Sequence, residues 1–238
     1  MNILYLGNIS AIKTFPLFKL FIHLPLEIVM SEENINREDQ LIKDATDVFL
    51  TYGIKSVTMD DVAKHLRVSK KTIYQFVKDK EDLVNRCVRR DCDFIEEKVL
   101  AIQSQNLKAI DENFAISTVI IEELKNIHPS IFYDLEKYYP QAMAMLVEMR
   151  HDYIGGVMRQ NLNKGIAEGV YRPELNVEIM TQLWVLRLNV IFNPTLFPMD
   201  EFHPKDVYFE MFIHHIRGIA NSRGLKELEK NQNKNTKV

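Results

Sequence analysis

Glycine and proline are scarce in this sequence of 238 residues, which contains eight of each. No proline occurs between Pro25 and Pro129, and no glycine occurs between Gly53 and Gly155. Because sheets need frequent turns, and turns favour these two residue types, such long gaps argue against strands. Apolar residues recur instead with the 3.6-residue period of helices. The sequence therefore predicts an all-α protein.

Cysteine is also rare, and Cys87 and Cys92 cannot form the disulfide framework of a small secreted protein. A reducing compartment suits such a chain, so we expect a cytoplasmic location. The apolar stretch at residues 15–30 is interrupted by prolines and charges, and a membrane span needs about 20 consecutive apolar residues. It also lacks the unbroken apolar segment of a secretory signal, so no stable membrane association is expected.

Charge is unevenly distributed along the chain, whose net charge is −3. Residues 37–90 carry twelve Lys or Arg against nine Asp or Glu, whereas residues 91–238 carry sixteen against twenty-one. A run of basic residues is often only a solvated face. A basic N-terminal module on an acidic body is nevertheless a first indication of an anionic partner such as nucleic acid.

The basic region contains the start signals of a series of short helices. An apolar stripe at helical spacing precedes Gly53, which is a natural C-terminal stop. Thr58, Ser69 and Asp79 are good N-cap residues for the three helices that follow. The helix after Asp79 has no breaker until about residue 105, so we expect a long, stiff helix there.

Two short helices joined by about three residues form a helix-turn-helix at about residues 58–77. A short polar helix is by itself an ordinary structural element. In this sequence, however, the exposed positions of the second helix carry hydrogen-bond donors at the end where a recognition helix meets base edges. Together with the capped helices and the local positive charge, this pattern predicts DNA binding.

The run from Thr58 to Leu83 reads TMDDVAKHLRVSKKTIYQFVKDKEDL. With it, residues 37–84 resemble the N-terminal domain of the TetR family of transcriptional regulators. The run departs from the family pattern at Arg67, where the family usually has a glycine in the turn. A weaker resemblance covers the C-terminal domain, at the Gly-Val-Tyr-Arg run that begins at Gly169.

The resemblance implies that Tyr74 and Lys80 contact DNA phosphates and that the residues opening the third helix lie nearest the bases. The predicted DNA-binding residues are Thr58, Ser69, Lys70, Lys71, Thr72, Tyr74, Gln75 and Lys80. The resemblance also implies a homodimer on double-stranded operator DNA, most simply a repressor that an unknown small-molecule effector releases. Activation, or repression without a ligand, stays open.

Two segments near the C-terminus, residues 177–192 and 207–220, are apolar nearly all round. Such a helix is buried on all sides, either in the core or against its twofold mate in a four-helix dimer interface. We expect the interface, with Phe212 in it. Met and aromatic residues are more often core than pocket. The candidates for a ligand pocket are Phe114, His128, Met143, Trp184 and Arg187.

The chain thus divides into four predicted segments. Residues 1–36 are a poorly ordered extension, which translation starting at Met30 would shorten. Residues 37–96 form the DNA-binding domain and residues 97–223 the regulatory and dimerisation domain. Residues 224–238 form a polar, frayed tail.

Signatures of catalysis and of metal binding are missing from the sequence. It has no Gly-rich phosphate loop, paired-carboxylate motif or nucleophile elbow, and the adjacent His214 and His215 point to different faces of a helix. We therefore predict no enzyme, no catalytic residue, no metal and no cofactor. The alternatives are a helical ligand-binding or scaffold protein without DNA-binding activity, and an α-helical enzyme without a recognisable motif.

Overall fold

The computed structural model describes residues 26–235, apart from residues 126, 194 and 199. The chain divides between Asp39 and Gln40 into two units, and the features that follow belong to the second, apart from the first part of the N-terminal helix. The described residues form helices and no strand, which confirms the all-α prediction. None of the described helices is long and apolar enough to cross a membrane.

Four helices make up the N-terminal part, and the helix-turn-helix lies where the sequence predicts it. The first helix begins eleven residues before the predicted start at residue 37. The rest of the predicted extension, residues 1–25, lies outside the described residues. The helices are α1 (Leu26–Tyr52), α2 (Met59–Leu66), α3 (Lys70–Ile73) and α4 (Lys80–Gln103).

The three predicted N-caps are confirmed. The Thr58 hydroxyl accepts a hydrogen bond from the backbone N–H of Asp61 at 3.2 Å, and the Asp61 carboxylate accepts one from the Thr58 N–H at 2.9 Å. This reciprocal capping box satisfies two N–H groups that the start of α2 would otherwise leave unpaired. Ser69 and Asp79 each accept from the backbone N–H three residues further on, at 3.0 and 2.8 Å.

The turn between α2 and α3 holds Arg67 in the left-handed region, with φ 56° and ψ 36°. A side chain there costs about 1–2 kcal/mol relative to ordinary backbone, which is why glycine suits this position. The turn forms nevertheless, because the N–H groups of Arg67 and Val68 bond to the last carbonyls of α2, those of Lys64 and Ala63. The departure from the TetR pattern therefore leaves the turn intact.

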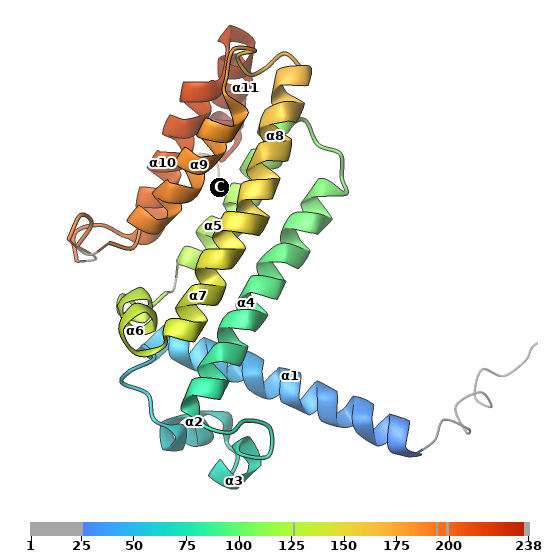
Figure 1. The fold of residues 1–238 in the computed structure, drawn as a ribbon, viewed down its shortest axis with the longest axis vertical. Helices are drawn as coiled ribbons and strands as arrows, with labels where there is room; N and C mark the ends of the chain where they lie inside the picture. The colour runs from blue at the N-terminus through green and yellow to red at the C-terminus, as the bar shows by residue number, and fades with distance from the viewer. Residues whose placement is uncertain (1–25, 126, 194, 199, 236–238) are drawn as a thin grey trace, which may run out of the picture. The chain divides into compact units, whose positions relative to one another are not determined.

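The C-terminal part is a helical bundle around α5 (Ala109–Leu124), which contacts α4, α8, α10 and α11. In Figure 1, α7 and α8 follow each other along one side of α4, joined by a π-helical turn at Met149–Ile154. Helix α9 packs on α8, and α10 packs on α5. The remaining helices are α6 (Ile131–Tyr138), α7 (Pro140–Glu148), α8 (Gly155–Ala167), α9 (Val177–Val190), α10 (Pro204–Ile219) and α11 (Ser222–Asn235).

Buried apolar side chains form two clusters. The first joins the helix-turn-helix to the first half of α4, and it includes Ile131 and Leu135 of α6 and Ala142 of α7. The second is built mainly by α5, α8, α9, α10 and α11. Helix α6 and the start of α7 lie within the predicted regulatory domain, residues 97–223, yet they share a core with the DNA-binding helices. A change in that domain can therefore reach the helix-turn-helix through packed side chains.

The expectation of a frayed tail from residue 224 is wrong as far as Asn235, because these residues form most of α11. Leu228 is buried in the second cluster, and Asn231 donates a hydrogen bond to Asp111 at 2.8 Å. The backbone at Gly224 passes so near the Val170 carbonyl oxygen that a Cβ atom would lie 2.2 Å from it. The few apolar positions in so polar a segment gave too weak a period to predict a docked helix.

Candidate nucleic-acid interface and internal cavity

Helix α3 is buried on one face, and its polar side chains on the other face are exposed to solvent. Ile73 and Val77 are buried in the first cluster and fix α3 against the other helices. Lys71, Tyr74 and Gln75 are exposed, Tyr74 by 44%. The exposed cations around them are Lys64, Arg67, Lys70 and Lys78. This surface has the donors and the charge that a DNA duplex requires.

Several of the predicted DNA-binding side chains already have partners within the chain. Lys70 Nζ lies 3.0 Å from an Asp60 carboxylate oxygen, and the Thr72 hydroxyl lies 2.7 Å from that of Ser69. An exposed ion pair is worth about 1 kcal/mol or less, so DNA can displace it. Lys71 has no ion pair with any described residue, which makes it the more available donor of the two lysines.

Lys80 bonds to the backbone of its own domain. Its Nζ donates to the Ile54 carbonyl at 2.6 Å and lies 6.0 Å from the centre of the Phe49 ring. Burial lowers the pKa of this half-buried ammonium group. An ammonium has three donors, so this bond leaves capacity for a phosphate. Lys80 thus ties the α1–α2 turn to the start of α4, whatever it does on DNA.

The α1–α2 turn is also bonded to α6. The buried Asp134 carboxylate accepts from the Lys55 N–H at 2.8 Å and from the Ser130 hydroxyl at 3.0 Å. The His128 N–H donates to the Leu50 carbonyl at 2.7 Å. His128, predicted to line a ligand pocket, therefore lies at the junction between α6 and the DNA-binding helices.

Replacing the buried Asp134 with alanine should lower the free energy of unfolding by about 1–3 kcal/mol, because it leaves the part-buried Lys55 N–H and Ser130 hydroxyl without their acceptor. Urea unfolding monitored by circular dichroism measures the change. Glu136→Ala, on the exposed face of α6, is the control and should change stability by less than about 0.5 kcal/mol. Equal effects of the two substitutions would show that the Asp134 bonds do not hold the junction.

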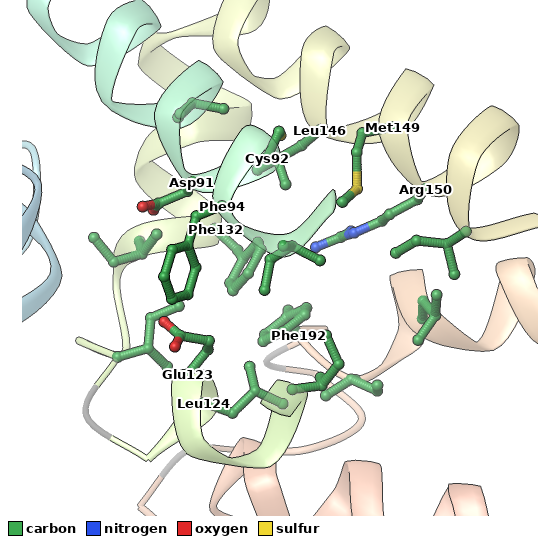
Figure 2. Close-up of a pocket in the computed structure, with 18 of the residues that line it drawn as sticks. Asp91, Cys92, Phe94, Glu123, Leu124, Phe132, Leu146, Met149, Arg150 and Phe192 are labelled. Carbon is green, nitrogen blue, oxygen red and sulfur yellow. The ribbon is translucent and has the colours of Figure 1, made fainter. Parts of the chain in front are cut away.

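An internal cavity of about 230 Å³ is lined by residues of both clusters. Most of its lining is aliphatic and aromatic, and Figure 2 shows three charged side chains in it, Asp91, Glu123 and Arg150. A concave, mostly apolar space with a few polar groups is typical of a small-molecule site. Among the described residues, no group of three or more His, Cys, Asp or Glu side chains is placed to hold a metal ion.

Of the five residues predicted to line a pocket, Trp184 lines this cavity. Phe114 and Met143 pack in the two clusters, and Arg187 is half-exposed on α9; none of these, nor His128, is among the cavity's lining residues. Arg150 is not among the predicted residues, although the sequence holds a signal for it. Arg150 occupies a position of the apolar stripe that runs through α7 and α8, where a charged side chain is out of place.

Arg150 is 7% exposed, and its guanidinium lies beside two aromatic rings that stack on each other, with ring centres 3.4 Å apart. Its central carbon lies 5.3 Å from the centre of the Phe132 ring and 5.4 Å from that of Phe192. One nitrogen, Nη1, donates to the side-chain oxygen of Asn189 at 3.1 Å. Burial lowers the pKa of Arg150 to about 10, so the group stays charged at neutral pH. No described carboxylate forms an ion pair with it.

Asp91 is the titratable acid of the cavity. Burial, reinforced by the nearby Glu123 carboxylate, raises the pKa of Asp91 to about 7. Glu123 itself lies at an exposed position of α5, and partial burial raises its pKa as well. At neutral pH Asp91 is therefore partly protonated.

The Asp91 carboxyl should make the stability of the protein fall as pH rises. Its folded pKa of about 7 exceeds the ordinary value of 3.8, so the folded state holds this proton over a range in which the unfolded chain has lost it. Asp91→Asn should therefore match the parent near pH 4 and be more stable at pH 8. The difference should grow by at most about 1.4 kcal/mol per pH unit. Urea unfolding at both pH values measures it, with the exposed Asp93→Asn as control. A difference independent of pH would contradict the assignment.

Helix α9 has a second apolar face besides the one that packs in the core. Trp184, Val185 and Leu188 are buried. A stripe at helical spacing lies on the surface: Ile179, Leu183, Leu186 and Val190, exposed by 56, 39, 61 and 37%. The all-round apolar pattern thus divides into a core face and a surface face, which we call the α9 stripe.

Phe212 is not part of such a surface, and its assignment to a dimer interface is wrong. The side chain is 1% exposed within a single chain and packs edge to face with Phe114, with ring centres 5.1 Å apart. An apolar pattern cannot distinguish burial within a chain from burial between chains.

This arrangement, a capped helix-turn-helix joined to a helical bundle with an internal cavity, defines a class of helical DNA-binding regulators. Residues 41–87 match the family described as "Bacterial regulatory proteins, tetR family". The N-terminal domain is thus of the TetR type, as the resemblance of residues 37–84 implies, and the chain is a DNA-binding regulator.

Curated relatives include the "Uncharacterized HTH-type transcriptional regulator YhgD" of Bacillus subtilis. It is 27% identical over 158 residues, which cover 64% of this chain and 82% of the relative. The "HTH-type transcriptional repressor KstR2" of Mycobacterium tuberculosis is 22% identical over 152 residues, covering 61% and 74%.

Solved structures with the same fold include a transcriptional regulator from Cytophaga hutchinsonii, with a TM-score of 0.63 and 15% identity. The match covers 78% of this chain and 99% of the other. The KstR2 structure from Mycobacterium tuberculosis has a TM-score of 0.53 at 17% identity, covering 78% and 96%. At these identities the likeness shows the fold alone.

Proposed function

We propose that the chain is a homodimeric repressor, active in the cytoplasm and without catalytic activity. It binds operator DNA through α3 and leaves it when a small molecule fills the cavity. The observation that carries this proposal is the double role of α4. Its capped N-terminus, with Lys80, lies against the helix-turn-helix, and one face of the same helix lines the cavity from Val84 to Val99.

A dimer would be built on the α9 stripe. Exposed apolar residues at helical spacing pair well with their own twofold mates, because a symmetric interface brings the same patch from both chains together. In such a dimer the two α3 helices must stand about 34–36 Å apart, or a multiple of one DNA turn, to enter the major groove at both half-sites. Any ligand that favours a different spacing lowers operator affinity by population shift.

The path from the cavity to α3 would run through two contacts. A ligand that moves α4 acts on Lys80 and, through it, on the α1–α2 turn. A ligand that moves the adjoining α6 acts on the same turn through Asp134. Each contact joins a side chain of one helix to a backbone group of the turn, so it depends on where that helix holds the side chain.

Selection of bound fragments from genomic DNA tests the proposal. The purified chain should enrich a short sequence with two inverted half-sites, and one dimer should protect both. The affinity for that sequence should exceed the affinity for scrambled DNA by about 10³-fold or more. Enrichment of no sequence, with uniform salt-sensitive binding to all fragments, would contradict a regulator that recognises an operator.

A further inference from the structure

We propose that the cavity binds an amphipathic monoanion, an apolar chain or ring system with one carboxylate, whose acid group pairs with Arg150. This inference rests on the proposed ligand-controlled function, because it names the class of ligand. It is argued from the side chains that surround the Arg150 guanidinium.

A guanidinium buried without a counter-charge is energetically unfavourable, because its hydration is lost and nothing replaces it. Arg150 has five N–H donors, and only one hydrogen bond from it, to the neutral Asn189 side chain, is found within the described part of the chain. The stacked rings of Phe132 and Phe192 beside the cation accept no strong hydrogen bond. The planar fork of donors matches a carboxylate, which would restore both the charge and the hydrogen bonds.

The backbone at Arg150 is itself unusual. The residue belongs to the π-helical turn Met149–Ile154, and π-turns within helices are rare and frequent at functional sites. The side chain extends from this turn toward the cavity, as Figure 2 shows. A structure that keeps both a wider helical turn and a buried unpaired charge at one position is built around something that the charge binds.

The remaining lining determines the apolar part of the ligand. Apart from its few polar groups the cavity wall is aliphatic and aromatic, from Leu124, Leu146 and Met149 in Figure 2 to Trp184. Its volume of about 230 Å³ lies just below the ~300–1,000 Å³ of sites for drug-sized ligands. A single hydrocarbon chain of medium length therefore suits it better than a large polycyclic ligand.

The two acids could instead favour a cation, but their position and protonation argue against it. Figure 2 shows Asp91 and Glu123 across the cavity from Arg150. With a pKa of about 7, Asp91 is partly neutral at physiological pH, and Glu123 stands at an exposed position. Arg150 stays charged at that pH. At neutral pH the buried group of the cavity that is fully charged is therefore the Arg150 guanidinium, which is positive.

The protein contains one tryptophan, and Trp184 lines the cavity, so its fluorescence reports occupancy. The full chain is titrated with dodecanoate, dodecan-1-ol and dodecylammonium below their aggregation concentrations, with calorimetry as a second readout. Dodecanoate should bind at least about tenfold more tightly than the alcohol, as a charge-assisted hydrogen-bonded pair predicts. Dodecylammonium should bind more weakly than both.

Arg150→Met should abolish the preference for dodecanoate while leaving the alcohol's affinity within about twofold. Because the variant removes an unpaired buried charge, it should be at least as stable as the parent in urea, which a merely structural arginine would not allow. The control is Arg159→Met, on α8, whose exposed guanidinium pairs with Glu178 at 2.8 Å. This variant should keep the preference.

Equal affinities for dodecanoate and dodecanol, a preference that survives Arg150→Met, or tightest binding of dodecylammonium would each overturn the inference. Operator binding by the ligand-free proteins is measured in parallel. Its absence would contradict the proposed regulator. Intact operator binding without dodecanoate binding would contradict only the assignment of the ligand.

Discussion

A chain with Leu186→Glu should be a folded monomer that binds operator DNA at least about 100-fold more weakly than the parent. Leu186 is the most exposed residue of the α9 stripe, at 61% in the single chain, so a glutamate there has no effect on the core. In a symmetric dimer the two glutamates would face a desolvated interface and each other, at a cost of several kcal/mol. A monomer reaches only one half-site, which removes the gain from linking two recognition helices.

Light scattering gives the mass of the variant, and circular dichroism shows whether it is folded. The matched control is Leu100→Glu, since Leu100 is a leucine of α4 exposed by 56% and distant in sequence from the stripe. The control should remain dimeric. A Leu186→Glu protein that keeps the parent's mass would show that the α9 stripe is not the interface. Phe212→Glu cannot serve here, because it would place a charge in the core of a single chain.

Lys71→Ala should weaken operator binding about 10- to 100-fold, and binding to scrambled DNA much less. Lys71 lies exposed at the start of α3 with no ion pair among the described residues. A good bidentate contact to a base edge is worth about 1–3 kcal/mol of discrimination. Lys70→Ala should have the smaller effect, because Lys70 must first leave Asp60.

Lys80→Ala should weaken binding to operator and to scrambled DNA alike. It should also reduce the slope of log affinity against log salt concentration by about one unit per half-site, as expected for a phosphate contact. It also removes the bond to Ile54, so its unfolding free energy should fall, and binding must be measured where the variant is folded. Tyr74→Phe should lose only about one hydrogen bond, of the order of 1 kcal/mol.

Titrations of both duplexes across a salt series separate these roles. Lys78→Ala, an exposed lysine beyond α3, is the control for loss of one surface charge. If neither Lys70→Ala nor Lys71→Ala lowers the ratio of operator affinity to scrambled-DNA affinity, α3 does not contact the bases specifically. If Lys80→Ala leaves scrambled-DNA binding unchanged, Lys80 acts only within the chain.

Local signals explain how much of the fold could be predicted. The caps at Thr58, Ser69 and Asp79 depend on residues three positions apart, and all three formed as the sequence indicates. The α11 helix depends instead on one buried leucine, Leu228, meeting a distant cluster, which a local pattern cannot show.

The site was less predictable, because it depends on which helices meet. Trp184 lines the cavity, whereas His128 lies outside it and its backbone N–H donates to the Leu50 carbonyl of α1. Arg150 could not be predicted, because a single charge within an apolar stripe is also found at solvent-exposed positions. The sequence does not show that apolar side chains of other helices surround it. The sequence also could not predict that Phe212 is buried in its own chain and that the α9 stripe is exposed. Both helices are apolar on most sides, so the pattern does not show which face packs in the core.

The most direct test of the central claim is the sedimentation of the full chain with two labelled duplexes, the selected operator and a scrambled sequence of equal length. The account predicts a complex of two chains per operator, formed with at least about 10³-fold higher affinity than any complex with the scrambled duplex at physiological salt. Equal affinity for the two duplexes, or a complex of one chain per operator, would contradict a dimeric regulator that reads its site through α3.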